Sequence, residues 1–569
     1  MQCMLDMRDF TAHDLHGLTP EAIKALAAQM LEHIETQASE LQRRQQLIEA
    51  KQQLIECKDR DIAWRDAKLE KVNFELARLK RWKFGAKTEA MSAEQRRLFE
   101  ETLAEDEASL QAQLERLREE AAAAAAQTPG KPKAPARRPR REALPGHLRR
   151  VEHHHEPENT TCTTPACGAP MTRIGEDVSE RLDIVPAEFF VHRHIYGKWA
   201  CRCCQTLKQA PAVPEVIEGG MAASGLLAHT LISRFADHQP YYRQETINAR
   251  SGVHTPRSTL AAWAGQVGAA LEPLYGVHKR FVLGCRVLHG DETPVALLDP
   301  GAGKTKRAYV WAYARSHHDP TPGVVYDFCL GRGAQYPVAF LAGDERVGQR
   351  RWSGTLLTDR YSAYDTVLDV RVYPDRRAAA CVAHARRKFD ELAKAGVSPL
   401  AEEAIRRFAR IYEIEAELGG LQDDERQQAR QELAKPLWGT LMKWLELERR
   451  LVADGGTTAA AIDYTLNHWS ALTRHLDDGA VPIDNNHLER QIKPWAMGRK
   501  AWMFVGSELA GQRAAMVMSL VQSAKLHGHD PWAYLRDVLQ RLPTQLNSRI
   551  EELLPHRWQA LASNEQASQ

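Results

Sequence analysis

The chain has 569 residues, more than one hydrophobic core accommodates, so several domains are expected. Its apolar content of 43% is that of a globular protein, and a formal net charge of only +2 neither favours nor excludes a nucleic-acid partner. No signal peptide is recognisable and no apolar run is long enough to span a bilayer, so we expect a cytoplasmic protein without a membrane partner.

Residues 1–26 are a polar lead-in, and a long helical pattern occupies residues 27–126. Within it an isoleucine or leucine recurs every seven residues, at Ile34, Leu41, Ile48, Ile55, Ile62, Leu69 and Leu76. One apolar position repeated in this way is typical of a coiled coil, and we predict a parallel homodimer. The second apolar position of each heptad is poor, as Gln45 and Asp59 show, so a helix that packs along its own chain is the alternative.

Two basic stretches belong to this part of the chain. Around Trp82 and Phe84 lie Lys80, Arg81 and Lys83, an arrangement that suits phosphate contact beside a hydrophobic anchor, although an exposed helix end explains it as well. Residues 127–150 form a proline-rich linker that should be disordered alone and should neutralise phosphates near DNA. Its basic residues include Arg137, Arg138, Arg140 and Arg141.

Residues 151–215 hold five of the ten cysteines. Cys162 and Cys167 form one pair and Cys201 and Cys204 a second, with strand-like sequence between them. Two such pairs on two turns predict a zinc ribbon in which four thiolates hold one structural Zn²⁺. Cys203 could compete with Cys204 as a ligand, and free thiols in a small core are the alternative.

Residues 216–280 are predicted to be helical. Tyr241–Ser251, a turn at Gly252 and Thr255–Gln266 have the rhythm of a helix-turn-helix. Arg257 would then lie at the start of the second helix, where such proteins contact DNA bases. An ordinary helical hairpin that joins two domains is the alternative.

A mixed α/β domain is predicted from residue 281, and its first strand, Val287–Leu298, carries Asp291 and Glu292 among apolar residues. A carboxylate inside an apolar strand is costly unless it is paired or bound to a metal. Because successive strand residues point to opposite faces, only one of the two can serve a given site, and the other should meet solvent or a basic partner. Two exposed acids at a strand end are the alternative.

Two more carboxylates end or begin predicted elements of this domain. Asp359 closes the short apolar strand Thr355–Asp359, and Glu489 lies one turn inside a helix that Asp484 is expected to cap. Three carboxylates on separate elements suit a site in which two Mg²⁺ ions promote phosphoryl transfer.

The segments HGDETPV, LLTDRYSAYD, CVAHARRKF, DNNHLERQIKP and GRKAWMFVGS together resemble the motifs of IS66-family transposases, the DDE transposases of bacterial insertion sequences. The similarity extends from about Leu76 to Leu539. It implies an RNase H-like core whose catalytic triad, Asp291, Asp359 and Glu489, binds Mg²⁺ or Mn²⁺. The core is expected over residues 281–391 and 481–525, with a helical insertion at 392–480 and a C-terminal helical cap and tail at 526–569.

Other residues are expected to support this triad. The pair Cys381 and His384 lies between the second and third carboxylates, where it would support the active site or hold DNA. Asn485 and Asn486 lie four and three residues before Glu489 and could orient its carboxylate, whereas Lys493 could instead neutralise it. The basic residues expected to contact DNA near the site are Arg386, Arg387, Arg499 and Lys500.

The predicted fold is therefore a multidomain α+β protein with an N-terminal coiled coil, a zinc ribbon, a helical DNA-binding segment and an RNase H-like α/β catalytic core interrupted by a helical insertion. The predicted function is DNA strand cleavage and strand transfer at the ends of its own element, by a nucleoid-associated transposase. Its expected partners are double-stranded DNA of the element ends and of the target, a second copy of the chain, and accessory proteins of the same element. A nuclease that cuts without joining and a non-enzymatic zinc and helix-turn-helix DNA-binding protein are the alternatives.

Overall fold

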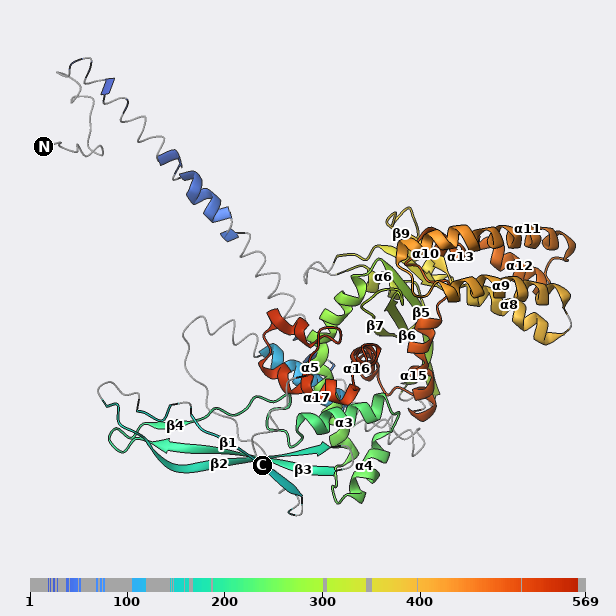
Figure 1. Cartoon of the computed structure of the whole chain (residues 1–569). Helices are drawn as coiled ribbons and strands as arrows, with labels where there is room; N and C mark the ends of the chain where they lie inside the picture. Colours follow the sequence, from blue (N-terminus) through green and yellow to red (C-terminus); the bar gives the residue numbers. More distant parts are fainter. Residues whose placement is uncertain are drawn as a thin grey trace. The chain divides into compact units, whose positions relative to one another are not determined.

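The computed structural model describes residues 144–560 apart from 145, 147, 158, 163–166, 186–187, 300–303, 344–349, 397 and 503, together with residues 105–118 and short stretches between 19 and 76 (Figure 1). The chain divides into two compact units, Met1–Phe74 and Glu75–Gln569. In the first unit residues 41–49 are helical, and the heptad residues Leu41 and Ile48 are 66% and 57% exposed. The heptad residues Ile34, Ile55 and Ile62 lie outside the described residues, so the coiled coil stays a prediction.

The helix of residues 105–118 packs inside the second unit, against α5 (Arg257–Leu283) and α16 (Glu508–Leu526). Arg513 of α16 is 1% exposed and donates hydrogen bonds of 2.9 Å and 2.8 Å to the carboxylates of Glu105 and Asp106. Arg116 pairs with Glu272 of α5 at 2.7 Å. A buried guanidinium without these carboxylates would be strongly destabilising, so this helix is a structural part of the second unit.

The cysteine-containing region is a four-stranded sheet with the order β1-β3-β2, in which β4 also pairs with β3. Its strands are β1 (Arg149–His155), β2 (Thr172–Val185), β3 (Glu188–Ala200) and β4 (Leu207–Gln209). β2 and β3 are antiparallel, and β1 is parallel to β3. One end of the sheet is apolar, with Leu182 and Val191 buried, and it packs against α3 (Ser224–Phe235).

The predicted pair of helices around Gly252 is confirmed as α4 (Tyr241–Arg250) and α5, and Gly252 has the positive φ of 75° that its turn requires. The predicted second helix begins two residues later than Thr255: its N-cap is Pro256 and its first residue is Arg257. The side chain of Thr255 is buried. α5 is 27 residues long and buries Leu260, Val267 and much of its length in the main core. It is therefore a central packing element as well as the second helix of the pair.

The predicted α/β domain contains a five-stranded sheet with the order β7-β6-β5-β8-β9. Its strands are β5 (Val287–Asp299), β6 (Lys304–Arg315), β7 (Val324–Cys329), β8 (Gly354–Thr358) and β9 (Arg376–Ala380). β5, β6 and β7 pair antiparallel as a meander, whereas β8 and β9 continue the sheet in parallel with β5.

Helices cover both faces of this sheet. α5, α16 and α15 (Asn486–Trp502) share the main core with one face, which presents residues such as Val310 and Ala312. α6 (Gln335–Leu341) and α7 (Ala363–Val367) cover the other face, which presents Trp311 and Tyr313. This alternation along β6 follows from the opposite directions of successive strand side chains.

A helical insertion separates β9 from α15 (Figure 1). It comprises α8 (Val382–Ala395), α9 (Pro399–Glu417), α10 (Asp423–Ala429), the π-helical turn η4 (Arg430–Ala434), α11 (Lys435–Leu451), α12 (Thr457–Asn467), α13 (Trp469–Leu472) and α14 (Arg474–Asp477). It has a core of its own, in which Phe389, Phe408 and Trp438 are buried. The insertion therefore begins at α8, directly after Cys381.

After α16 the chain ends in α17 (Pro531–Arg541) and the 3₁₀ turns η5 (Leu542–Thr544) and η6 (Asn547–Leu553), which pack on the main core. None of the helices in the described part of the chain is long and apolar enough to cross a membrane.

Candidate functional site

Two of the three predicted carboxylates lie beside each other because of the register of β5 and β8. These parallel strands pair Val287 with Thr355 and continue residue by residue to His289 with Leu357, a constant offset of 68 positions. Extending the same offset by two residues brings Asp291 next to Asp359, just past the end of β8. The spacing of the two aspartates in the sequence therefore equals the spacing that the sheet imposes.

Glu489, in the first turn of α15, joins them electrostatically. Burial, together with the negative charges of Glu292, Asp359 and Glu489, raises the pKa of Asp291 to about 8. Carboxylates that repel each other in a partly buried site need a cation to be ionised together. Oxygen ligands of this kind fit Mg²⁺ or Mn²⁺.

Glu292 points away from this cluster, as the strand alternation predicts. Its side chain is 1% exposed and pairs with Arg332, whose Nε donates a 2.7 Å hydrogen bond to it. The hydroxyl of Tyr364 donates a second bond of 3.1 Å. The prediction that one of the two acids would meet a basic partner is thus confirmed for Glu292, which has a structural role.

The turn after Asp359 is held in a strained conformation. Arg360 has a φ of 66°, in the left-handed region that residues with a Cβ rarely adopt. The Asp359 carboxylate accepts the backbone N–H of Tyr361 at 2.8 Å, and Thr358 Oγ1 accepts that of Arg360 at 3.1 Å. From the insertion, the hydroxyl of Tyr464 in α12 donates a 2.9 Å bond to the Asp359 carbonyl. The insertion therefore contributes directly to the position of the second aspartate.

The two neighbours of Glu489 that could pair with its carboxylate come from α8. His384 Nδ1 lies 3.9 Å from one carboxylate oxygen and Arg387 Nη2 lies 3.7 Å from the other. Cys381, His384 and Glu489 each place one possible ligand atom within 4.8 Å of the others. The alternative partner, Lys493, makes no ion pair with Glu489 in the described part of the chain, so the glutamate is not neutralised within its own helix.

The two asparagines lie elsewhere than predicted. Asn485 is fully buried and does not bond the carboxylate of Glu489; its Oδ1 lies 2.7 Å from His289 Nδ1, and its Nδ2 donates a 3.2 Å bond to the Gly290 carbonyl. Its backbone N–H donates to the sulfur of Cys381 at 3.2 Å. Asn485 thus connects β5, the start of α8 and the start of α15, the three elements that carry Asp291, His384 and Glu489.

Asn486 is exposed and bonds Asp484 instead, with its Nδ2 donating to the Asp484 carboxylate at 2.8 Å. If Asp484 were the N-cap, α15 would begin at Asn485, but it begins one residue later, at Asn486. The Asp484 carboxylate nevertheless accepts the backbone N–H of Asn486 at 3.1 Å. Sequence spacing placed both amides on the face of Glu489, but Asn485 precedes the helix, where that spacing does not apply, and Asn486 is its first residue, with its amide bonded to Asp484.

We therefore expect Asn485→Ala to destabilise the protein by about 2–3 kcal/mol, because it leaves His289 and the Gly290 carbonyl buried without partners. Thermal unfolding and Mg²⁺-dependent cleavage should both fall. Asn486→Ala, which changes the same atoms at an exposed position, is the matched control and should alter stability by less than about 0.5 kcal/mol. Equal effects of the two substitutions would contradict the positioning role of Asn485.

Five of the predicted DNA contacts lie in the described part of the chain. Arg386 and Arg387 are exposed on α8 next to His384, and Lys500 is exposed near the end of α15. Arg499 bonds the carbonyl of Pro294 at 3.0 Å, three residues beyond Asp291 on β5. Arg257 is half-buried at the start of α5. The remaining predicted contacts, Lys80, Arg81, Lys83, Arg137, Arg138, Arg140 and Arg141, lie outside the described residues.

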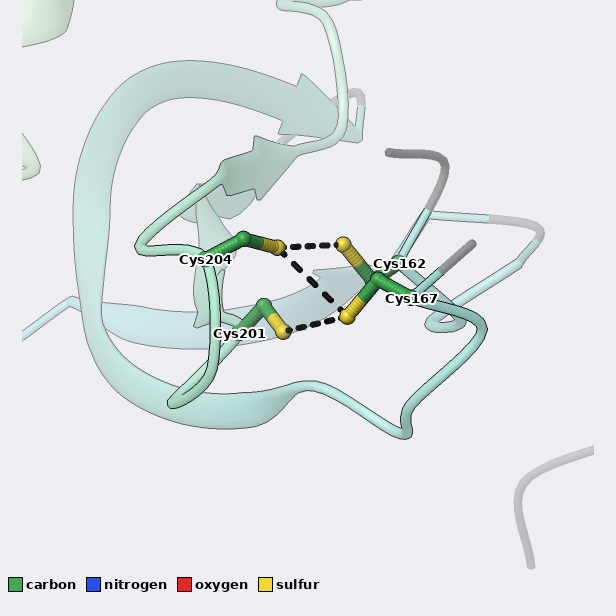
Figure 2. Close-up of side chains that lie close together, drawn as sticks. All are labelled: Cys162, Cys167, Cys201 and Cys204. Carbon is green, nitrogen blue, oxygen red and sulfur yellow. Dashed lines mark hydrogen bonds between the residues drawn. The ribbon is translucent and has the colours of Figure 1, made fainter. Parts of the chain in front are cut away.

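The four predicted zinc ligands come together at one end of the β2–β3 sheet (Figure 2). The sulfur of Cys162 lies 2.8 Å from that of Cys204, and Cys167 lies 3.8 Å from Cys201 and 3.7 Å from Cys204. Tetrahedral Zn²⁺ with Zn–S bonds of about 2.3 Å requires sulfur–sulfur distances of roughly 3.8 Å. The cluster therefore has the donors and nearly the dimensions of a structural zinc site.

Neighbouring residues take no part in this cluster. Cys203 is exposed, so Cys204 is the member of its pair that joins the other three sulfurs. His192 and His194 of β3 hydrogen-bond instead to His153 and His155 of β1, at 2.8 Å and 3.0 Å.

Sequence reasoning missed Arg332, Tyr464 and Arg360. Arg332 follows β7 and Tyr464 lies in the insertion, and neither carries a local pattern that reveals a partner about 40 or 105 residues away. Arg360 directly follows a predicted catalytic aspartate, and that position could have indicated that it lies beside the site.

Comparison with known proteins matches four family models to segments of this chain between residues 72 and 556. Residues 219–513 match the model of the Transposase IS66 family, residues 160–205 the zinc-finger binding domain of transposase IS66, and residues 519–556 the IS66 C-terminal element. Residues 72–152 match the model described as Transposase C of IS166 homeodomain. Two uncharacterized proteins of Sinorhizobium fredii (strain NBRC 101917 / NGR234) are similar to this chain. One, y4jD, is 40% identical over 73% of this chain and 82% of its own length; the other, y4qI, is 38% identical over 74% and 78%.

Proposed function

Since the chain belongs to the IS66 family of transposases, we propose that it binds the ends of its own insertion element, cleaves a DNA strand there and joins the new 3′-hydroxyl to target DNA. The observation that carries this proposal is the placement of Asp291 beside Asp359 by the register of β5 and β8, with the charge of Glu489 in range. The sheet, an antiparallel meander extended by two parallel strands, supports an RNase H-like core.

In the proposed mechanism Asp291, Asp359 and Glu489 hold the catalytic ions. Two Mg²⁺ or Mn²⁺ ions, when bound, would activate the attacking oxygen and stabilise the leaving one. His384 and Arg387 would hold Glu489 in place and contact the phosphate that reacts. Cys381 acts through Asn485, whose bonds to β5 keep Asp291 in register with the rest of the site.

DNA would be held by basic residues around this cluster. We place phosphate contacts at Arg386, Arg387, Arg499 and Lys500, which lie on the two helices that border the carboxylates. Arg257 would reach DNA from the start of α5, with the basic segments before residue 150 adding contacts that carry no sequence information. Such a protein would act at the nucleoid, together with accessory proteins of the same element.

The structural zinc of this proposal is bound by Cys162, Cys167, Cys201 and Cys204, which fit it in number, type and spacing. It would hold the open end of the β2–β3 hairpin, where few apolar side chains pack: the local core is limited to the cysteines and a few neighbours such as Met171.

The test of the whole proposal is incubation of the purified chain with Mg²⁺ and labelled DNA that carries the flanks of its own gene. A joined product supports transposition. A cut product without joining would replace it with a nuclease, and binding without either product would replace it with a non-enzymatic DNA-binding protein.

We also propose that the N-terminal heptads pair two copies of the chain, because Leu41 and Ile48 are exposed on a helix that repeats its apolar residue every seven positions. Replacing Ile48, Ile55 and Ile62 together with Asp should then put three charges into the only apolar position of the repeat and dissociate the dimer. Light scattering should show the mass fall by half, with cleavage of a single DNA end retained. An unchanged mass would contradict this contact.

A further inference from the structure

Helix α11 has two apolar faces, although the fold buries only one of them. Trp438, Leu441 and Leu445 face the core of the insertion and are at most 1% exposed. On another side, Leu447 is 59% exposed and Leu451 is 80% exposed. Large aliphatic side chains this exposed are unfavourable in water and mark contact surfaces when they are contiguous.

The residues on this side of α11 follow heptad spacing, and two of them, Leu437 and Trp444, are partly buried against the core of the insertion. Leu437, Thr440, Trp444, Leu447 and Leu451 succeed one another at intervals of three, four, three and four residues, which places them along one side of a helix. Leu433, four residues before Leu437 in the preceding turn η4, is also 51% exposed. We call this row the α11 stripe.

A neighbouring helix, α9, forms a groove with the first part of the α11 stripe, where Leu437 and Thr440 lie. α9 and α11 lie side by side in the insertion (Figure 1), and a pocket of about 270 Å³ opens between them. The guanidinium of Arg407 from α9 lies 4.8 Å above the ring of Trp444. The lining of the pocket is Glu403, Arg406, Arg407, Arg410, Leu437 and Thr440.

The groove has basic flanks. Arg406 and Arg407 share one carboxylate, Glu403, at 2.9 Å and 2.8 Å. Arg410 is exposed and makes no ion pair within the residues that the structure describes. On the other flank Lys443 and Arg450 are exposed, at the heptad positions next to the stripe. Like Arg410, Lys443 and Arg450 make no ion pair within the described residues, whereas Arg406 and Arg407 are already paired with Glu403.

These features distinguish between possible occupants. DNA phosphates would use the cations but would leave the leucines in water. A second copy of α11 would cover the leucines but would bring Lys443 and Arg450 against the same cations of its partner, and like charges at such flanks oppose pairing. A helix with an apolar face and acidic flanks satisfies both the stripe and its borders.

We propose that the groove between α9 and α11 binds an amphipathic, acidic helix of a partner protein, with its apolar residues on the α11 stripe and its carboxylates opposite Arg410, Lys443 and Arg450. Helix-in-groove contacts of this kind combine buried aliphatic anchors with charged rims. The proposal is independent of the cleavage chemistry, because none of these residues contacts the carboxylate cluster.

The test uses the full-length chain and a fluorescent synthetic helix of about three heptads with leucine at both apolar positions and glutamate at the flanks. Fluorescence anisotropy should show this peptide binding at least about tenfold more tightly than the same peptide with lysine flanks. The double substitution Leu447→Asp and Leu451→Asp should weaken binding about tenfold or more, and Arg410→Glu should weaken it to a lesser extent.

The matched control is Val370→Asp with Val372→Asp, two apolar residues that are 65% and 56% exposed outside the insertion, and it should bind like the parent. Circular dichroism of both double variants should equal that of the parent, since the side chains removed are exposed. The proposal is overturned if the two peptides bind equally tightly, or if neither peptide binds. It is also overturned by a lower mass of the leucine variant in light scattering, which would assign the groove to a second copy, or by weaker binding of the variant to duplex DNA.

Discussion

Asp291→Asn and Asp359→Asn are each expected to reduce Mg²⁺-dependent DNA cleavage by about three orders of magnitude or more while leaving DNA binding intact. The substitutions remove the ligand charge but little volume, and metal-ion stabilisation worth several kcal/mol corresponds to a factor of that size. Cleavage of labelled DNA at saturating Mg²⁺ and a gel-shift assay of the same DNA provide the two measurements. Cleavage at the parental rate by either variant would remove that aspartate from the site.

Stability provides a second readout that separates loss of chemistry from loss of fold. In the metal-free protein the pKa of Asp291 is raised to about 8 by burial and by its acidic neighbours. A carboxyl group with a raised pKa contributes stability that is present at low pH and is lost as the pH rises through that value. In EDTA, Asp291→Asn should therefore unfold at a higher temperature than the parent above pH 8, and its inactivity cannot then be ascribed to unfolding.

The third carboxylate has three matched controls in the same half of the chain. Glu489→Gln should lose cleavage and keep binding, because Glu489 acts on Asp291 electrostatically and lies beside His384. The controls are Glu446→Gln, Glu448→Gln and Glu508→Gln, at positions on α11 and at the start of α16 outside this cluster. If one of these variants is inactive while Glu489→Gln cuts normally, the third position has been assigned wrongly.

Cys201→Ser is expected to lose the single zinc of the chain and to unfold the end of the β2–β3 hairpin that carries the cysteines. Cys201 is 1% exposed, and its sulfur lies 3.8 Å from that of Cys167. Structural zinc contributes about 10–16 kcal/mol to the folding of small zinc modules, far more than the few apolar contacts here can replace. Metal analysis should find one zinc in the parent and none in the variant, and limited proteolysis should cut the variant near the hairpin end.

The control for this experiment lies two residues away. Cys203 is exposed and outside the cluster, so Cys203→Ser should keep its zinc and its resistance to protease. A wild-type chain that is fully folded without metal, or a Cys203→Ser variant that loses zinc as well, would contradict the assignment of the four ligands.

The outcome for the two asparagines shows where reasoning from spacing stops. The interval from Asn485 to Glu489 suggested a contact between the two side chains, but that contact depends on both residues lying inside a regular helix. Asn485 precedes α15, and its amide is directed to His289 and Gly290 on β5. A partner almost 200 residues away in the sequence decides that orientation.

The sequence by itself determined the parts of this protein whose physical cause is local or periodic. The strands β5 and β8 follow from their apolar residues, the opposite faces of Asp291 and Glu292 follow from the alternation of strand side chains, and the four zinc ligands follow from their thiols and spacing. Even the pairing of Asp291 with Asp359 was implicit, because the family resemblance supplied both residues and their separation of 68 equals the strand register.

Only the tertiary structure decided which distant residues complete each local feature. Arg332 neutralises Glu292, Tyr464 of the insertion bonds the turn after β8, and Arg513 joins the helix of residues 105–118 to the main core. The α11 stripe is a further example: its heptad spacing alone would predict a buried face, and only the fold shows that Leu447 and Leu451 are exposed. Each of these contacts depends on how whole helices and strands pack against one another. A buried polar group bonds the partner that this packing brings within about 3 Å, and no periodic pattern in the sequence identifies that partner.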